Sequence, residues 1–377
     1  MSATIPFIDL QAQRRRIAPE IERAVMAAVE GGQWIFGPQV RALEEQLAEF
    51  AGVKHCIACA NGTDALMIVL RAWDIGPGDA VFVPAFTFAA SAEVVALVGA
   101  TPVFVDVLED TYNLDPQSLE AAIAMVKCEG ELKPRAVMPV DLFGQPADYR
   151  VIEPIMAREK LKLLVDTAQA FGATLDGRQT AAIGDAAGTS FFPAKPLGCY
   201  GDGGATFTND SALAELLRSI RMHGQGADKY ENVRIGVNSR LDTIQAAILI
   251  EKLKIFPEEI ELRERVAQRY TEAFRRSNSV RPPHVIEGAQ STWAQYTIQV
   301  PDRDKLAADL KAKGIPTAIY YPTPLSHQKG YAQFPSAGTP VSDRIATHVI
   351  SLPMHPYLDE ATQDRIVAAV LEGVGAG

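Results

Sequence analysis

The segment LKLLVDTAQA, at residues 161–170, is a short apolar run that ends on an acidic residue. Such a run is typical of a strand buried on both faces of a parallel sheet. With five similar segments, it predicts strands at His55–Ala60, Ala80–Val83, Pro102–Asp106, Ala136–Asp141, Leu161–Asp166 and Ala187–Phe192. Helical patterns fall between several of them, at Thr63–Trp73, Ala89–Val98, Pro116–Val126 and Tyr149–Lys160. This alternation predicts an α/β fold, in which a large domain has a mainly parallel sheet covered by helices.

The two ends of the chain have a different pattern. Apolar residues at helical spacing predict helices around residues 17–29 and 40–50. Two long helices are expected at Ser239–Phe256 and Glu258–Arg276, separated by Pro257. A smaller α+β unit follows, predicted from Tyr296–Val300, Asp302–Lys313, Thr317–Tyr321 and Asp359–Val374. We therefore divide the chain into a large domain, residues 1–256, and a smaller C-terminal α+β domain, residues 257–377.

The composition is that of a globular protein. The chain has 377 residues, of which 47% are hydrophobic and 22% charged, and its net charge is −10. The basic cluster Arg14–Arg16 is short, so neither nucleic acid nor an anionic membrane is an expected partner. No apolar run reaches the roughly 18 residues of a membrane span, and the first residues lack the pattern of a secretory signal. We expect a cytoplasmic protein.

The cysteines do not predict a metal site. Cys56 and Cys59 form a C-x-x-C pair, which invites a metal or redox interpretation. They lie within a predicted strand, however, where residues three apart point to opposite faces. No second Cys/His pair has zinc-like spacing. We expect buried thiols and no bound metal.

Polar residues follow three of the predicted strands. Ligands bind at the carboxyl ends of the strands in open parallel sheets. After the first strand, Asn61 is suited to cap a helix, and the N–H groups of Gly62 and Thr63 could hold a phosphate. A capped helix without a ligand explains these residues equally well.

Asp166 ends a strongly apolar strand. A buried carboxylate needs a partner, because an unpaired buried charge costs several kcal/mol. The partner could be a metal, an arginine or a protonated ring nitrogen. The simpler alternative is that Asp166 caps the next helix.

Lys195 lies between Pro193 and Pro196, after an apolar strand and before a glycine-rich turn. Most lysines are solvated surface residues, but apolar surroundings lower the pKa of a lysine and favour its neutral amine. A neutral amine is a nucleophile that can form a Schiff base. With Asp166 for a pyridinium nitrogen, and Ser190 and a helix N-terminus for a phosphate, Lys195 indicates pyridoxal 5'-phosphate as the cofactor.

These motifs resemble those of the DegT/DnrJ/StrS family of sugar aminotransferases, which are fold-type I pyridoxal-phosphate enzymes. The resemblance covers nearly the whole chain. It is carried by residues 7–10, 61–66, 84–88, 165–169, 190–195, 201–204, 238–241 and 321–325. It implies transamination rather than dehydration, because some relatives that act as dehydratases have histidine in place of Lys195.

The resemblance also implies the roles of individual residues. Lys195 would hold the cofactor covalently, Asp166 would contact the ring nitrogen and Gln169 would pack by the ring hydroxyl. Phe88 would stack on the ring, although it could equally be a core residue. The implied phosphate ligands are Gly62, Thr63 and Ser190, with Asn238 from the neighbouring subunit of a homodimer whose active site lies at the subunit interface.

Within the family, the chain is most similar to enzymes that aminate C3 of a UDP-linked 3-oxo-uronic acid with glutamate as donor. The similarity is carried by residues 190–205, 221–225 and 232–240. A uronate carboxylate needs a cation, for which Arg240 is the first candidate and Arg234 the second, unless they form surface ion pairs. Tyr320 and Tyr321 would border the sugar, and His327 is displaced from the usual family pattern, so it receives no role.

Three other functions are open at this point. An aminotransferase acting on a dTDP-linked 3-oxo sugar or on another nucleotide-linked 4-oxo-6-deoxyhexose would have the same cofactor site. A nicotinamide-dependent dehydrogenase would need G-x-G-x-x-G after its first strand, where this chain has Ala60-Asn61-Gly62-Thr63. A non-catalytic regulator could have the same fold, because a fold does not fix a function.

Overall fold

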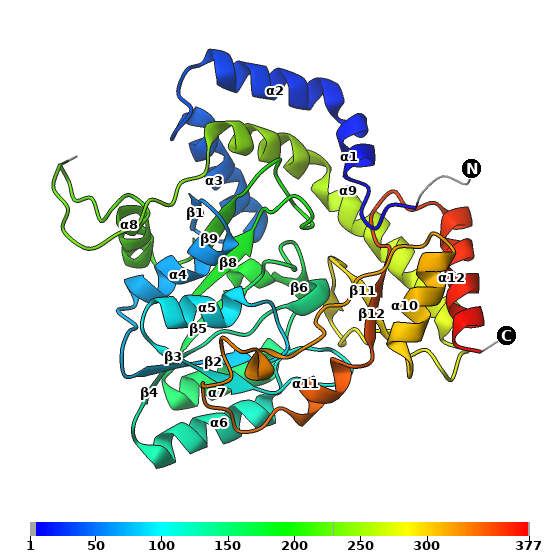
Figure 1. Ribbon diagram of the computed structural model, residues 1–377. Helices are drawn as coiled ribbons and strands as arrows, with labels where there is room; N and C mark the ends of the chain where they lie inside the picture. The colour runs from blue at the N-terminus through cyan, green and yellow to red at the C-terminus, as the bar shows by residue number, and fades with distance from the viewer. Residues whose placement is uncertain (1–4, 229, 376–377) are drawn as a thin grey trace.

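A seven-stranded sheet lies at the centre of the molecule (Figure 1). The computed structural model describes residues 5–228 and 230–375. The strand order is β1-β9-β8-β5-β4-β2-β3. In chain order the strands are β1 (His55–Cys59), β2 (Asp79–Pro84), β3 (Thr101–Val105), β4 (Lys133–Val137), β5 (Lys162–Asp166), β8 (Ala186–Ser190) and β9 (Gly204–Thr208). The predicted α/β fold with a mainly parallel sheet is confirmed.

Strand β9 was not predicted, because its short sequence GATFT follows a glycine-rich turn and carries two polar threonines. It pairs antiparallel to β1 on one side and to β8 on the other, whereas the pairs β8–β5, β5–β4, β4–β2 and β2–β3 are parallel. Six of the strands therefore run in one direction, and β9 alone runs against them. The carboxyl ends of the six and the start of β9 meet at one edge of the sheet.

Helices cover both faces of this sheet. One face packs against α3 (Pro38–Ala51), α6 (Pro116–Glu129), α7 (Tyr149–Glu159) and the first half of α9 (Thr243–Phe274). The other face packs against α4 (Gly62–Ala72), α5 (Ala90–Leu97) and α8 (Ser211–Ile220). At the N-terminal end, α1 (Leu10–Arg16) leads to α2 (Ala18–Glu30), which packs along α9. None of the described helices is long and apolar enough to cross a bilayer.

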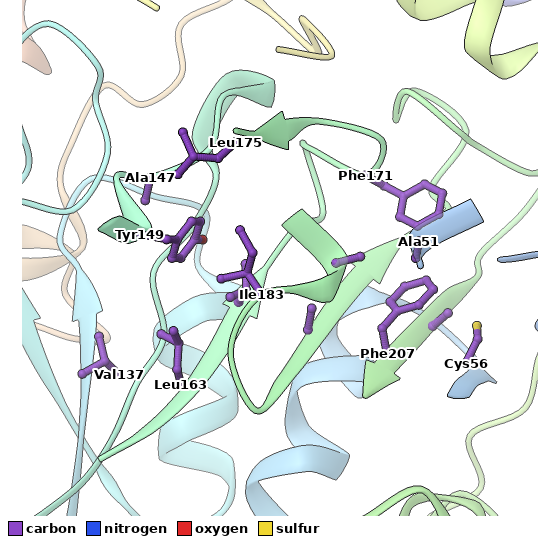
Figure 2. Packing of buried hydrophobic residues seen from close by; sticks show 14 of the residues in the cluster. Ala51, Cys56, Val137, Ala147, Tyr149, Leu163, Phe171, Leu175, Ile183 and Phe207 are labelled. Carbon is purple, nitrogen blue, oxygen red and sulfur yellow. The ribbon is translucent and has the colours of Figure 1, made fainter. Parts of the chain in front are cut away.

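The C-x-x-C cysteines divide between these two faces, as predicted. Cys56 belongs to the core on the α3 side and Cys59 to the core on the α4 side, and both thiols are free and buried. Figure 2 shows Cys56 beside Phe207, its partner in the adjacent strand, with the ring of Phe171 stacked 5.3 Å from that of Phe207. Within residues 5–228 and 230–375, no group of three or more His, Cys, Asp or Glu residues could hold a metal ion.

A smaller unit packs at the C-terminal end of α9 (Figure 1). Its two strands, β11 (Tyr296–Gln299) and β12 (Val349–Leu352), pair antiparallel and pack with α10 (Arg303–Ala312) and α12 (Glu360–Gly373). In the segment Thr317–Tyr321, which the sequence places in this unit, Ala318 forms a single β-bridge, to Ser351. The remaining short elements are β6 (Thr174–Leu175), β7 (Arg178–Gln179), β10 (Ala289–Gln290) and α11 (Pro340–Ile345).

The two long helices predicted on either side of Pro257 are one helix, α9. A proline inside a helix costs about 3 kcal/mol because it removes a backbone hydrogen bond and crowds the preceding turn. Here Phe256 and Ile260 are buried in the core of the large unit, and their packing outweighs that cost. The predicted domain boundary at residue 256 lies inside α9, and the division into residues 1–256 and 257–377 stays a prediction.

Candidate active site

The ends of strands β1, β8 and β5 bring the predicted motifs together at one edge of the sheet. Cys59 at the end of β1 and Ser190 at the end of β8 both lie opposite Gly204, the first residue of β9. In the next strand, β5, Asp166 lies beside Gly188. Because β9 runs antiparallel to its neighbours, its first residue, Gly204, lies beside the carboxyl ends of β1 and β8. The segments that follow Cys59, Asp166 and Ser190 therefore meet at one edge of the sheet.

A cavity of about 450 Å³ lies at this edge. Most of the predicted site residues line it, namely Gly62, Thr63, Phe88, Asp166, Gln169, Ser190, Lys195, Tyr320 and Tyr321. Asn238 and Arg240 do not. Asp166, Lys195 and Asp202 are the charged side chains on its wall, so among the described residues Lys195 is the one cation there.

The first motif forms the N-terminus of α4. Asn61 caps the helix, since its side chain accepts a hydrogen bond from the backbone N–H of Asp64 at 2.8 Å. A side chain at position 62 would bring a Cβ atom within 2.6 Å of the Cβ of Ser190, so the close approach of α4 to β8 requires glycine. The first N–H groups of a helix have no partner within it. The helix is therefore capped, and the N–H groups of Gly62 and Thr63 at its start lie close to Ser190, where they could hold an anion.

Asp166 is buried, with 5% of its surface exposed. Its Oδ1 accepts a hydrogen bond from the backbone N–H of Ala168 at 3.0 Å, and its Oδ2 accepts one from the hydroxyl of Ser91 at 3.3 Å. A turn rather than a helix follows it, so Asp166 is not a helix cap. Burial raises the pKa of Asp166, while the Ala168 N–H, the Lys195 charge and the Ser91 hydroxyl lower it. This carboxylate can therefore take a cationic partner in the cavity.

The Lys195 side chain enters the cavity from a tight loop. Its backbone N–H donates to the carbonyl of Phe192 at 2.9 Å, and further along the loop Cys199 N–H donates to the carbonyl of Phe191 at 2.8 Å. Burial lowers the pKa of Lys195, and the negative charge of Asp166 raises it. Burial is the larger of the two effects, so the pKa of this amine lies below that of a solvated lysine, which is the direction that a nucleophilic lysine requires.

Two side chains of helix α9 hold this loop in place. Lys252 is buried, and its Nζ donates to the carbonyl of Gly198 at 2.6 Å and lies 4.3 Å from the centre of the Tyr200 ring. Two turns earlier on the helix, Gln245 accepts a hydrogen bond from the backbone N–H of Tyr200 at 2.9 Å. The loop that carries Lys195 is thus held at two points by one rigid helix.

Aromatic side chains form the opposite wall. Phe88 is 58% exposed and lines the cavity, so it is not a core residue and its ring is free to stack on a ligand. The ring of Tyr321 lies 6.4 Å from that of Phe88 and 6.0 Å from that of Phe86. Gln169 is fixed by two hydrogen bonds, from Phe143 N–H at 2.7 Å and to the Tyr321 hydroxyl at 3.3 Å.

Comparison with known proteins decides the family. Residues 15–371 match the model of the DegT/DnrJ/EryC1/StrS aminotransferase family. The chain belongs to this family. A UDP-2-acetamido-2-deoxy-3-oxo-D-glucuronate aminotransferase from Pseudomonas aeruginosa is 49% identical over 97% of this chain and 99% of its own. The resemblance stated from the sequence is confirmed, and these relatives support an aminotransferase rather than a dehydrogenase or a non-catalytic regulator.

Solved structures of aminotransferases have the same fold. The crystal structure of a DegT/DnrJ/EryC1/StrS aminotransferase from Brucella abortus is 53% identical, covers 98% of this chain and 100% of its own, and superposes with a TM-score of 0.97. NtdA from Bacillus subtilis, with bound cofactor PMP, is 27% identical, covers 100% of this chain and 86% of its own, and has a TM-score of 0.90.

Several residues on the wall of this aminotransferase cavity were not predicted. Ile8 and Thr87 lie inside the family motifs at residues 7–10 and 84–88 but were given no role, whereas Gln295 comes from a distant segment with no recognisable pattern. Ser91, which contacts Asp166, was missed because it lies four residues beyond Thr87 inside a predicted helix. A search for polar residues one helical turn after a site residue would have found it.

Asn238 and Arg240 lie outside the cavity of their own chain. Asn238 is exposed and pairs with Met222, and Arg240 is half-buried. Ser239, between them, is buried and accepts a hydrogen bond from the backbone N–H of Ala60 at 3.1 Å. Ser239 therefore connects this segment to the residue before the first motif, but the side chains of Asn238 and Arg240 are not part of the cavity wall.

Proposed function

We propose that this aminotransferase transfers an amino group from glutamate to C3 of a UDP-linked 2-acetamido-2-deoxy-3-oxo-glucuronic acid, in the synthesis of a surface polysaccharide. The cavity that joins Lys195 to Asp166, in a chain 49% identical to an aminotransferase named for this sugar, is the observation that carries the proposal. The alternatives are a dTDP-linked 3-oxo sugar and another nucleotide-linked 4-oxo-6-deoxyhexose.

The cofactor is pyridoxal 5'-phosphate. The PMP held by NtdA is its amine form. The residues of this chain fit the group, because the site supplies an anion cradle at the start of α4, a buried carboxylate and an exposed aromatic face. In the proposed arrangement Gly62, Thr63 and Ser190 bind the phosphate, while Asp166, Gln169 and Phe88 hold the ring.

When bound, the cofactor's protonated ring stabilises negative charge at the amino-bearing carbon. Asp166 would keep that ring protonated, because its carboxylate is held in place by the Ala168 N–H and the Ser91 hydroxyl. Lys195 would move the proton as general acid and base, since its pKa is lowered by burial and it lies close enough to Asp166 to feel its charge.

The substrate brings more negative charge than this cavity can balance. A UDP-linked uronate carries a diphosphate and a carboxylate, and glutamate adds two carboxylates, whereas Lys195 is the one cation among the described residues of the wall. We propose that a homodimer supplies the remainder, with Asn238 reaching the phosphate and Arg240 the uronate carboxylate of the other subunit. Their location outside their own cavity supports this arrangement. Tyr320 and Tyr321 would border the sugar.

The protein is also proposed to work in the cytoplasm. Cys56, Cys59 and Cys199 are free and buried, and Cys128 is free and exposed. Free thiols, one of them exposed, support a reducing compartment.

The experiment that tests the cofactor and donor uses absorbance. The purified protein should bind pyridoxal phosphate with a visible absorption band, Lys195→Ala should lack that band, and glutamate should convert the cofactor to its amine form. A wild-type protein that gains no band would refute the cofactor assignment. Conversion by wild-type protein separates an aminotransferase from a binding protein.

A second experiment tests the sugar. UDP- and dTDP-linked 3-oxo and 4-oxo sugars are offered with glutamate, and the products are identified by mass. We expect fastest turnover with the UDP-linked 3-oxo-uronate. Arg240→Gln should raise KM for this uronate by roughly 10- to 100-fold, the value of one charged hydrogen bond, and leave a neutral 6-deoxy sugar unaffected. Preference of the wild type for the neutral sugar would reject the role of Arg240.

A further inference from the structure

Two buried hydroxyl groups form a chain that ends on Asp166. Ser91 Oγ donates to Asp166 Oδ2 at 3.3 Å and lies 3.2 Å from Thr87 Oγ1. Both side chains are buried, with exposures of 1% for Ser91 and 2% for Thr87. A serine hydroxyl has a single proton, so when Ser91 donates to Asp166 the second hydrogen bond must be donated by Thr87. The chain therefore runs from Thr87 through Ser91 to the carboxylate.

We propose that Thr87 and Ser91 are positioning residues that keep Asp166 ionised and fix its carboxylate for the ring nitrogen of the cofactor. The inference rests on the proposed function, since it concerns how this chain prepares Asp166 for that ring. Hydroxyls in series polarise one another, so the outer Thr87 strengthens the donor that Ser91 presents.

Local backbone geometry explains why these two residues cooperate. They lie four residues apart at the entry to α5, where Ser91 N–H donates to the carbonyl of Phe88 at 3.2 Å. Thr87 lies in the bend before the helix and Ser91 in its first turn. The segment that carries Phe88 to the cavity wall therefore also brings the Thr87 hydroxyl to that of Ser91, which contacts Asp166.

The surroundings give Asp166 few other donors. Apart from the Ala168 N–H, the group that favours its charge is Lys195, whose own pKa is lowered by burial. Three further ionisable groups feel the charge of Asp166. Asp141 has a pKa that burial raises to about 8, and burial also raises the pKa values of Tyr149 and Tyr321, so all three are uncharged at neutral pH. The hydroxyl chain is therefore the third support of the charged carboxylate, after the Ala168 N–H and the charge of Lys195.

The test is a pH titration that follows the visible absorbance of the purified enzyme loaded with its cofactor. A carboxylate that loses a donor becomes a stronger base and takes a larger share of the proton on the ring nitrogen. The ring then withdraws less electron density from the nitrogen that would join it to Lys195. The pKa of that nitrogen therefore rises, and it would keep its proton to higher pH. Ser91→Ala should move the titration midpoint upward by about 0.5–1 pH unit, part of the value of one hydrogen bond to a charged group.

Two variants at position 87 isolate the hydroxyl. Thr87→Val removes it with little change of shape and should move the midpoint in the same direction by a smaller amount. Thr87→Ser keeps it and should titrate as the wild type does. Ser342→Ala is the matched control, because Ser342 also donates from a buried hydroxyl to a buried carboxylate, that of Asp106 at 2.6 Å, away from the cavity wall.

Each outcome decides the proposal. Upward shifts in Ser91→Ala and Thr87→Val, with wild-type behaviour in Thr87→Ser and Ser342→Ala, support it. An unshifted Ser91→Ala or Thr87→Val overturns it, as does an equal shift in either of the other two variants. Asp141 is present in every variant, so its own titration cancels in the comparison. A wild-type protein that binds no pyridoxal phosphate would instead be a failure of the proposed function.

Discussion

Replacement of Gly62 by alanine tests whether the contact between α4 and β8 shapes the phosphate cradle. The new Cβ would lie 2.6 Å from the Cβ of Ser190 and 3.1 Å from its Cα, where ordinary contacts begin at 3.4 Å. The gap between the helix start and the strand end must therefore open by about 0.8 Å, because neither atom belongs to a flexible side-chain end. That movement separates Gly62 and Thr63 from Ser190 on the other side of the cradle.

The magnitude follows from the cost of overpacking. Inserting one methyl group into a close-packed contact costs about 1–3 kcal/mol. If the strain is relieved by widening the cradle, the same free energy is lost from phosphate binding, which is roughly a 5- to 150-fold rise in the Kd for pyridoxal phosphate. The assay is reconstitution of the cofactor-free protein, followed by absorbance at increasing pyridoxal phosphate concentrations. Thermal unfolding of the cofactor-free variant shows how much of the cost falls on the fold instead.

Gly330→Ala is the matched control, because Gly330 is exposed and a Cβ there would meet no atom within 4 Å. It should bind the cofactor as the wild type does. If Gly62→Ala binds pyridoxal phosphate within about twofold of the wild type and is equally stable, the cradle does not depend on this contact and the reasoning is refuted.

Two predictions concern buried groups whose titration changes stability. Burial raises the pKa of Asp141 from 3.8 to about 8, so the folded protein holds a proton that the unfolded chain releases, and this contribution to stability is lost as pH rises through that range. Asp141→Asn should therefore gain stability relative to the wild type between about pH 5 and 8 in urea unfolding, and a difference that is constant with pH would contradict this. Burial lowers the pKa of Lys252 from 10.5 to about 8, so wild-type stability should rise between these pH values, where the unfolded lysine binds more protons. Lys252→Met should abolish that rise, and an unchanged slope would show that Lys252 is not its source.

The sequence predicted the strand ends well, because a polar residue after an apolar run is a local signal. Asn61, Asp166 and Lys195 were all found in this way, and the cavity brings their segments together. The register that unites them depends on β9, whose five residues carry no distinctive pattern. Tertiary pairing with two neighbours makes it a strand, which no local propensity could reveal.

Contacts between distant segments were equally hidden from the sequence. Lys252 is a lysine in a helical pattern, where a solvated position is the default, yet it is buried beneath the loop of Lys195. Gln295 lines the cavity from a segment far along the chain. Pro257 predicted a helix end, but packing on both sides of it maintains one continuous helix.

The continuity of α9 has a practical consequence for anyone who wishes to dissect this protein. With 32 residues the helix is about 48 Å long, and it contributes Phe256 and Ile260 to one core and Tyr270 and Phe274 to the other. A gene fragment that stops at residue 256 would lack Ile260 in the first core, and a fragment that starts at residue 257 would begin in the middle of the helix. Both halves would be prone to aggregate when expressed alone, so fragments should be cut at loops that leave this helix whole.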